Sequence, residues 1–173
     1  MRVEFFKGGG RRYRSRLHRP DGVVVEFDGG SYNGLFGTTE ELPHDLAHLI
    51  VEDELAVARG VWGVMAAGGL FKHLHVVSGR QRPHATATGR ALVKEAHEDI
   101  LRAELLVRAV CDAPSPDPAI VGETMRAYGW TTTFTREQLE RTQARLSAGA
   151  QRWHDLFPDS PMLLEWPAAP KRG

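Results

Sequence analysis

The stretch that decides the fold is VEFFKGGGRRYRSRLHRPDGVVVEFD, residues 3–28. It contains three segments, 3–7, 12–18 and 23–28, that are rich in β-branched and aromatic residues or alternate between polar and apolar side chains. Three glycines separate the first two segments, and Arg19-Pro20-Asp21-Gly22, which is typical of a tight turn, separates the second from the third. The stretch predicts an antiparallel meander of three strands.

Helical patterns follow the meander. A helix is predicted over 43–59, because Pro43 suits a first turn, acidic residues gather near the start, and Gly60 follows as a stop signal. A second helix is predicted over 91–111. Its apolar residues form one stripe at helical spacing: Leu92, Ala96, Ile100, Ala103, Val107 and Val110.

Two more helices are predicted from their first residues. Asp117-Pro118 caps a short helix that ends near Gly129, and Thr135-Arg136-Glu137-Gln138 is a capping box that opens a longer one. The longer helix is expected to place these residues on one face: Leu139, Leu146, Ala150, Trp153 and Phe157. Of the remaining segments, 61–67 is short and apolar and suits the core, whereas 70–89 is predicted as a strand followed by a mobile loop.

The end of the chain completes the predicted sheet. Residues 162–167 are expected to form a last short strand that returns to the N-terminal strands and ends at Pro167. The sequence therefore predicts an α+β fold, with an N-terminal antiparallel β-meander joined by a C-terminal strand and packed against four to five helices. We expect a single domain over 1–167 and a loose tail over 168–173.

Composition restricts the class of protein. A chain of 173 residues fits one domain, which at this length buries about 70% of its unfolded surface. Cys111 is the lone cysteine, so no intramolecular disulfide can form. The chain shows no signal peptide and no apolar run of roughly 20 residues, so we expect a cytoplasmic protein with no membrane partner. Acidic and basic residues balance at 22 each, which gives no reason to expect nucleic acid.

Basic residues nevertheless concentrate at the N-terminus. Residues 1–20 contain seven of them: Arg2, Lys7, Arg11, Arg12, Arg14, Arg16 and Arg19. They could dock an anionic partner, or they could form the solvated face of a hairpin, and their alternation with apolar residues favours the hairpin. The glycine-rich loop 29–37 lacks the Lys and Ser-Thr pair of a phosphate loop, so no nucleotide is expected there.

The segment best suited to metal binding or catalysis is His44-Asp45-Leu46-Ala47-His48. Two histidines four residues apart project from one face of a helix, so both imidazoles can approach one metal ion. Zincins use this spacing in His-Glu-x-x-His, with the Glu as general base. Asp45 stands at that position here and is the candidate catalytic base, or a residue that orients a ligand. We predict His44 and His48 as ligands of zinc or another divalent metal.

A further ligand must come from another element. Glu52 continues the same helical face but lies eight residues from His44, roughly 12 Å along the axis, so both cannot readily bind one ion. Glu52 is instead predicted to support His48, to form a separate site with it, or to pair with an arginine. The candidates for the further ligand are His73, His75, His84, His97 and Glu104. His97 ranks first, because a helix packed on the first one would present it directly.

Two resemblances bear on this segment. Residues 42–52, 60–63 and 66–69, with the N-terminal hairpins and the ending 164–167, resemble a group of small uncharacterised actinobacterial proteins over most of the chain. His44-Asp45-x-x-His48 is similar to the zinc motif of a ubiquinone-biosynthesis family, in which a Glu follows twelve positions after the second His. The corresponding residue here is Gly60.

The favoured hypothesis is a metal-binding protein that is a small hydrolase-like or lyase-like enzyme with a small-molecule substrate. The competing hypothesis is a non-catalytic interaction module, in which the histidines are structural. Its acidic helix and basic hairpin would then meet each other, another protein, or a second copy in a homo-oligomer.

Overall fold

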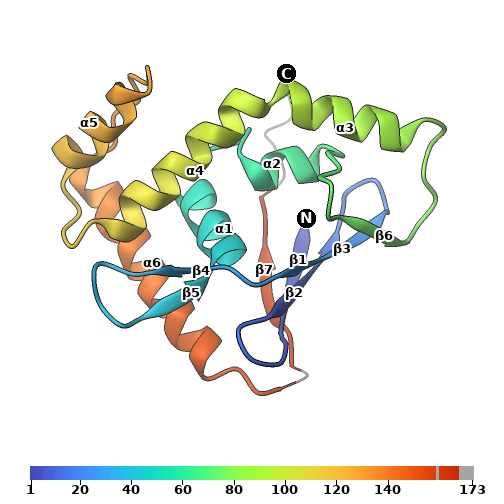
Figure 1. Ribbon diagram of the computed structural model, residues 1–173, viewed down its shortest axis with the longest axis horizontal. Coiled ribbons are helices and arrows are strands. Elements are labelled where there is room, and N and C mark those ends of the chain that lie inside the picture. The colour runs from blue at the N-terminus through green and yellow to red at the C-terminus, as the bar shows by residue number, and fades with distance from the viewer. Residues whose placement is uncertain (159, 168–173) are drawn as a thin grey trace.

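The structure is a computed structural model that describes residues 1–158 and 160–167 (Figure 1). The predicted loose tail over 168–173 lies outside the described residues. In chain order the elements are β1 (Arg2–Lys7), β2 (Tyr13–His18), β3 (Val24–Gly29), β4 (Tyr32–Gly34), β5 (Glu41–Pro43), α1 (His44–Glu54), α2 (Val61–Ala66), β6 (His75–Ser78), α3 (Ala85–Glu95), α4 (His97–Asp112), α5 (Pro118–Ala127), α6 (Arg136–His154) and β7 (Met162–Glu165).

The main sheet has five strands in the order β6-β3-β2-β1-β7, and every neighbouring pair is antiparallel. The N-terminal meander and the return of the last strand to β1 are confirmed. The register places Phe5 opposite Ser15 on β2 and Met162 on β7. β6 is the strand expected within 70–89. A second sheet, made of β4 and β5, was not predicted from the sequence.

The two faces of the main sheet have opposite characters. Alternate residues of the meander, including Val3, Phe5 and Leu17, are fully buried against the helices. On the other face Arg16 pairs with Glu26 at 2.5 Å, and its guanidinium also lies over the ring of Phe6. Neighbouring acids therefore compensate this part of the basic N-terminus, as expected for the solvated face of a hairpin.

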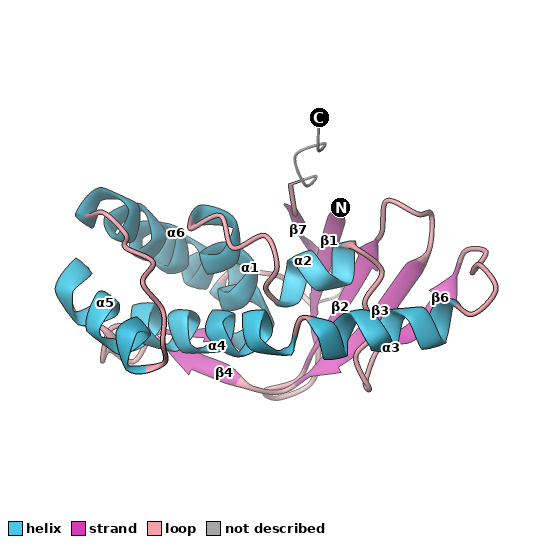
Figure 2. Ribbon diagram, turned by 90° about the horizontal axis from the view of Figure 1, so that it is seen from above, coloured by secondary structure: helices cyan, strands magenta, loops and turns pink. Residues whose placement is uncertain are grey.

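The helices form a layer over the apolar face and extend beyond the sheet (Figures 1 and 2). α2 packs on the sheet through Trp62, whose ring centroid lies 5.8 Å from that of Phe5. α1 contacts α2, α4 and α6 and is buried without interruption from Leu46 to Glu52. A helix that is buried on all sides normally carries only apolar residues. His48 and Glu52 in its centre therefore need polar partners.

Three helix predictions need correction. The helix over 91–111 is two helices, α3 and α4, which meet at Ala96 (Figure 1). The two helices contact different parts of the protein. Gly89 of α3 accepts a hydrogen bond from Leu70 N, whereas α4 packs on α1. α1 ends at Glu54 rather than residue 59, because the chain turns at Ala56 with φ +55°. Phe157 is 77% exposed, because α6 ends at His154 before reaching it.

Both predicted helix caps are present. Asp117 accepts a hydrogen bond from Ala119 N at 2.8 Å, and Thr135 and Gln138 form the reciprocal capping box.

Six helices are described in place of the expected four to five, within the predicted α+β class. In the described part of the chain, no helix is both long enough and apolar enough to cross a membrane.

Candidate metal centre

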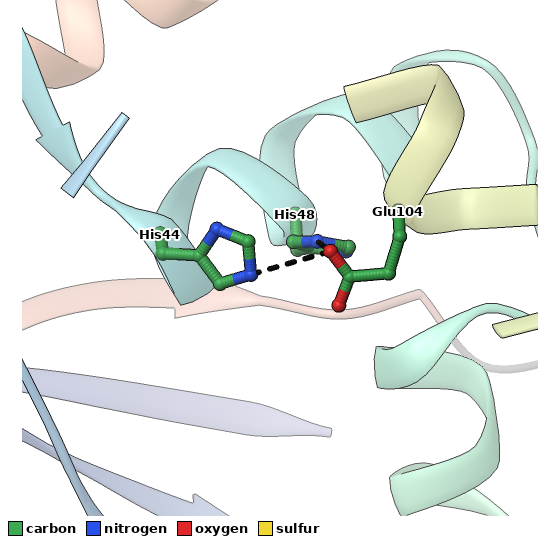
Figure 3. A group of neighbouring side chains, drawn as sticks. All are labelled: His44, His48 and Glu104. Atoms are coloured by element: carbon green, nitrogen blue, oxygen red, sulfur yellow. Dashed lines mark ion pairs between the residues drawn. The ribbon is translucent and has the colours of Figure 1, made fainter. Parts of the chain in front are cut away.

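Three side chains from two helices meet where α1 and α4 pack together. His44 is the first residue of α1, His48 lies one turn later, and Glu104 lies in the second turn of α4 (Figure 3). One ligand atom from each residue can be chosen so that all three atoms lie within 4.8 Å of one another. Two imidazoles and one carboxylate therefore face a single point between the helices.

The separations suit one small ion. Glu104 Oε2 lies 3.5 Å from His44 Nε2 and 3.1 Å from His48 Nε2. Zinc bonds of about 2.0–2.1 Å in a tetrahedron place neighbouring donor atoms about 3.3 Å apart. The two distances to Glu104 lie on either side of this value, and all three ligand atoms lie within 4.8 Å of one another.

The other ring nitrogen of each histidine has its own acceptor. His44 Nδ1 lies 2.9 Å from Asn33 Oδ1, and His48 Nδ1 lies 2.9 Å from Glu52 Oε1. An oxygen acceptor at Nδ1 places the proton of a neutral ring on that nitrogen and leaves the lone pair on Nε2. Both lone pairs then belong to the nitrogens that face Glu104.

His48 Nε2 is buried and has no hydrogen-bond partner among the described residues. Glu104 is near, but the contact lacks the angles of a hydrogen bond. Leaving a buried polar atom without a partner costs about 1–3 kcal/mol. Such an atom in the centre of a protein is unusual and requires an explanation.

Glu52 holds the His48 imidazole in place through its contact with Nδ1. Its carboxylate accepts hydrogen bonds from Val61 N and Trp62 N, both at 3.0 Å, in addition to the contact with His48. A Cβ at Gly60 would lie 2.5 Å from this carboxylate, so only glycine fits at position 60. Glu52 thus joins the start of α2 to the imidazole, in agreement with the predicted supporting role.

The charges of the cluster shift its protonation equilibria. Burial lowers the pKa of His48, but the adjacent carboxylates of Glu104 and Glu52 outweigh burial and raise it to about 9. Burial raises the pKa of Glu104, but His44 and His48 outweigh it and hold the pKa well below its usual range. Burial raises the pKa of Glu52. The site therefore favours a positive charge between its two carboxylates.

Asp45 points to a different partner. Its carboxylate accepts a hydrogen bond from the Tyr13 hydroxyl at 2.5 Å, and its backbone oxygen accepts one from Trp62 Nε1 at 2.9 Å. Burial raises the pKa of Asp45 and also that of Tyr13. A Cβ at Gly29 would collide with the Tyr13 ring, so glycine on β3 leaves room for this pair.

A cavity of about 340 Å³ opens beside the cluster. Its polar lining includes His44, Asp45 and Glu104, and apolar side chains cover much of the rest: Phe27, Val61, Met65, Phe71, Leu74 and Ile100. The cavity has the volume of a small-molecule site and reaches two of the three candidate ligands.

The structure brings together His44, His48 and Glu104, with Glu52 behind His48. His97 is exposed at the start of α4, two turns before Glu104, and does not join the group. Among the candidates for the further ligand, Glu104 therefore replaces the first-ranked His97, because Glu104 faces α1. His73 lines the cavity without joining the group, and His75 and His84 are exposed.

The contacts of Asn33 and Tyr13 are not predictable from the sequence. Asn33 lies on β4, within the glycine-rich segment 29–37, and no local pattern connects it with His44. Tyr13 alternates with the polar residues of β2, a pattern that predicts only a place in the sheet.

No protein-family model, curated protein or solved structure matches this chain.

Proposed function

We propose that the protein binds one divalent, zinc-like metal ion through His44, His48 and Glu104. The observation that carries this proposal is the buried Nε2 of His48, which has no hydrogen-bond partner among the described residues. A metal ion at this point would accept both imidazole lone pairs and one oxygen of Glu104. The Nδ1 contacts to Asn33 and Glu52 supply the support that metal-bound histidines normally receive.

The same donor set supports an enzymatic role. Two His and one Glu with a further position open to substrate or water is a ligand set of catalytic zinc sites, whereas structural sites use four protein ligands. The bound metal would supply Lewis acidity and lower the pKa of a water molecule to about 7. The adjoining cavity offers the open side, so we propose a hydrolase-like or lyase-like reaction on a small, partly apolar molecule.

Asp45 and Tyr13 form the proton-handling pair in this proposal. Both line the cavity that contains His44 and Glu104, and their hydrogen bond joins a carboxylate to a phenol. Burial raises the pKa of Asp45, which brings the carboxyl group closer to the range in which it can both accept and donate a proton. Asp45 thus keeps the role of candidate base.

The competing function is a structural or interaction module, and one observation favours it. With its pKa raised to about 9, a protonated His48 can itself bridge Glu52 and Glu104 as an ion pair. In that case a proton would take the place of the metal. Because the two alternatives predict opposite responses to zinc, a titration separates them.

Zinc is expected to bind tag-free protein with a stoichiometry of one and to raise its melting temperature. At a free zinc concentration of 100 times Kd, binding stabilises the folded state by about 2.7 kcal/mol. For a chain of this size that corresponds to roughly 5–10 °C. Isothermal titration calorimetry and differential scanning calorimetry measure the two effects. An unchanged melting temperature together with no binding heat would contradict the metal-binding proposal and leave the structural alternative.

Cobalt substitution tests whether the bound metal has an open position. We expect the visible spectrum of the Co²⁺-loaded protein to change when acetohydroxamate is added, because the cavity beside His44 and Glu104 admits a small chelating molecule. A Co²⁺ spectrum that does not respond would indicate a closed, structural site. The metal-binding proposal would survive that result, but the enzymatic proposal would not.

A further inference from the structure

A second cavity, of about 420 Å³, has no part in the proposed function. It lies between the β2–β3 turn, the segment after α2, the loop 80–83 and α3. We call it the Arg19 pocket, after one of its lining residues. It shares no lining residue with the cavity beside the candidate metal centre.

Arg19 is an unusually buried cation. Its side chain is only 8% exposed, and Nη2 donates to Asp21 Oδ2 at 2.5 Å. Nε is buried and has no hydrogen-bond partner among the described residues. A buried guanidinium needs its donors satisfied, and a single carboxylate does not satisfy this one. Arg19 lines the pocket and keeps one donor without a partner among the described residues, which favours an anionic ligand.

Two further arginines line the same pocket. Arg80 and Arg82 belong to the exposed loop before α3, and Asp21 is the single acidic residue in the lining. Because Asp21 already pairs with Arg19, the lining retains an excess of positive charge. Gly68, with φ +107°, lies against Arg19; a Cβ there would be 3.0 Å from Nη2. Glycine at this position thus leaves room for the guanidinium.

The start of α3 borders the pocket. His84, the residue before the helix, has φ +61° and makes no side-chain cap, and the first turn carries no acidic residue. Ala85 N donates to Arg82 O and Thr88 N donates to His84 O, so the helix contributes the partial positive charge of its first turn, which favours an anion, rather than free N–H groups. Ala85 and Thr88 line the pocket, so this end of α3 borders the space reached by the three arginines.

We propose that the Arg19 pocket binds a phosphate group, either free phosphate or the phosphate of a small metabolite. Three arginines suit a phosphate, because its several oxygens can accept hydrogen bonds from guanidinium groups on different sides. The pocket is separate from the metal centre, so this inference stands or falls independently of the proposed zinc chemistry.

The test uses inorganic phosphate as the probe and the complete protein, with calorimetry at constant ionic strength set by chloride. We expect phosphate to bind and Arg82→Gln to weaken binding about tenfold, the effect of losing one charged hydrogen bond. Arg82 is exposed, so this variant should fold normally. Arg90→Gln is the matched control, because it also removes one positive charge but from a residue of α3 that does not line the pocket. This variant should change the phosphate affinity less than about twofold.

Glycerol 3-phosphate distinguishes the two sources of the ligand. Tighter binding than inorganic phosphate would support a phosphorylated metabolite, and weaker binding would support free phosphate. The proposal is overturned if phosphate binds no better than acetate at equal ionic strength. It is also overturned if Arg90→Gln weakens phosphate binding as much as Arg82→Gln does.

Discussion

Replacing His48 with alanine is expected to reduce the zinc affinity of the protein at least about 100-fold. Structural zinc sites with four ligands bind with about 10–16 kcal/mol, so losing one ligand removes about 3 kcal/mol or more. His48 contributes the most buried of the three ligand atoms, with 1% of its side chain exposed, so water cannot replace it at low cost. Competition with a chromogenic zinc chelator measures the change in affinity.

Two further variants keep this prediction falsifiable. His97→Ala is the matched control, because His97 is exposed on α4 and lies outside the cluster; it should bind zinc as the unmodified protein does. Glu104→Gln removes the charged ligand from a side chain that is 44% exposed, so the fold should tolerate it while zinc affinity falls. Unchanged affinity in both His48→Ala and Glu104→Gln would exclude this cluster as the binding site.

Glu52→Ala is expected to produce the largest loss of stability, about 3–5 kcal/mol in the free energy of unfolding without metal. The carboxylate is fully buried and accepts from His48, Val61 N and Trp62 N. Alanine would leave these donors buried without a partner and would open a cavity beside Gly60. Urea unfolding followed by circular dichroism measures the change.

Glu54 supplies the comparison for Glu52. It lies at the end of the same helix and pairs with Arg141 and Arg145 at 2.9 and 2.8 Å, near the surface. Surface ion pairs contribute about 1 kcal/mol or less, so Glu54→Ala should have a small effect. Glu52→Gln, which keeps an oxygen for the backbone amides, should lose less stability than Glu52→Ala. Equal losses in Glu52→Ala and Glu54→Ala would show that the buried carboxylate does not hold α2 to α1.

The order of strands was largely predictable, because it depends on local patterns. The turn Arg19-Pro20-Asp21-Gly22 and the alternation along β2 define the meander, and the apolar segment 162–165 has few other places to pair. The division at Ala96 was not predictable from periodicity, since both helices share one apolar stripe and the helical hydrogen bonds continue through the junction. There, tertiary contacts of α3 and α4 with different partners decide the path of the chain.

The candidate site was predictable only in part for the same reason. The spacing of His44 and His48 within one helix is local, and so is the distance that prevents Glu52 from joining His44. Glu104 and His97 both lie on α4, seven residues apart, and which of them meets α1 depends on where the helices cross. The contacts of Tyr13 with Asp45 and of Asn33 with His44 likewise join separate elements.

The most direct test of the metal centre is an anomalous difference map from crystals of tag-free protein grown with zinc, measured at the zinc absorption edge. We predict one strong peak between α1 and α4, about 2.0–2.2 Å from His44 Nε2, His48 Nε2 and a carboxylate oxygen of Glu104. A map with no peak there, in crystals whose solvent contains ample zinc, would contradict the account and leave a protonated His48 between two carboxylates.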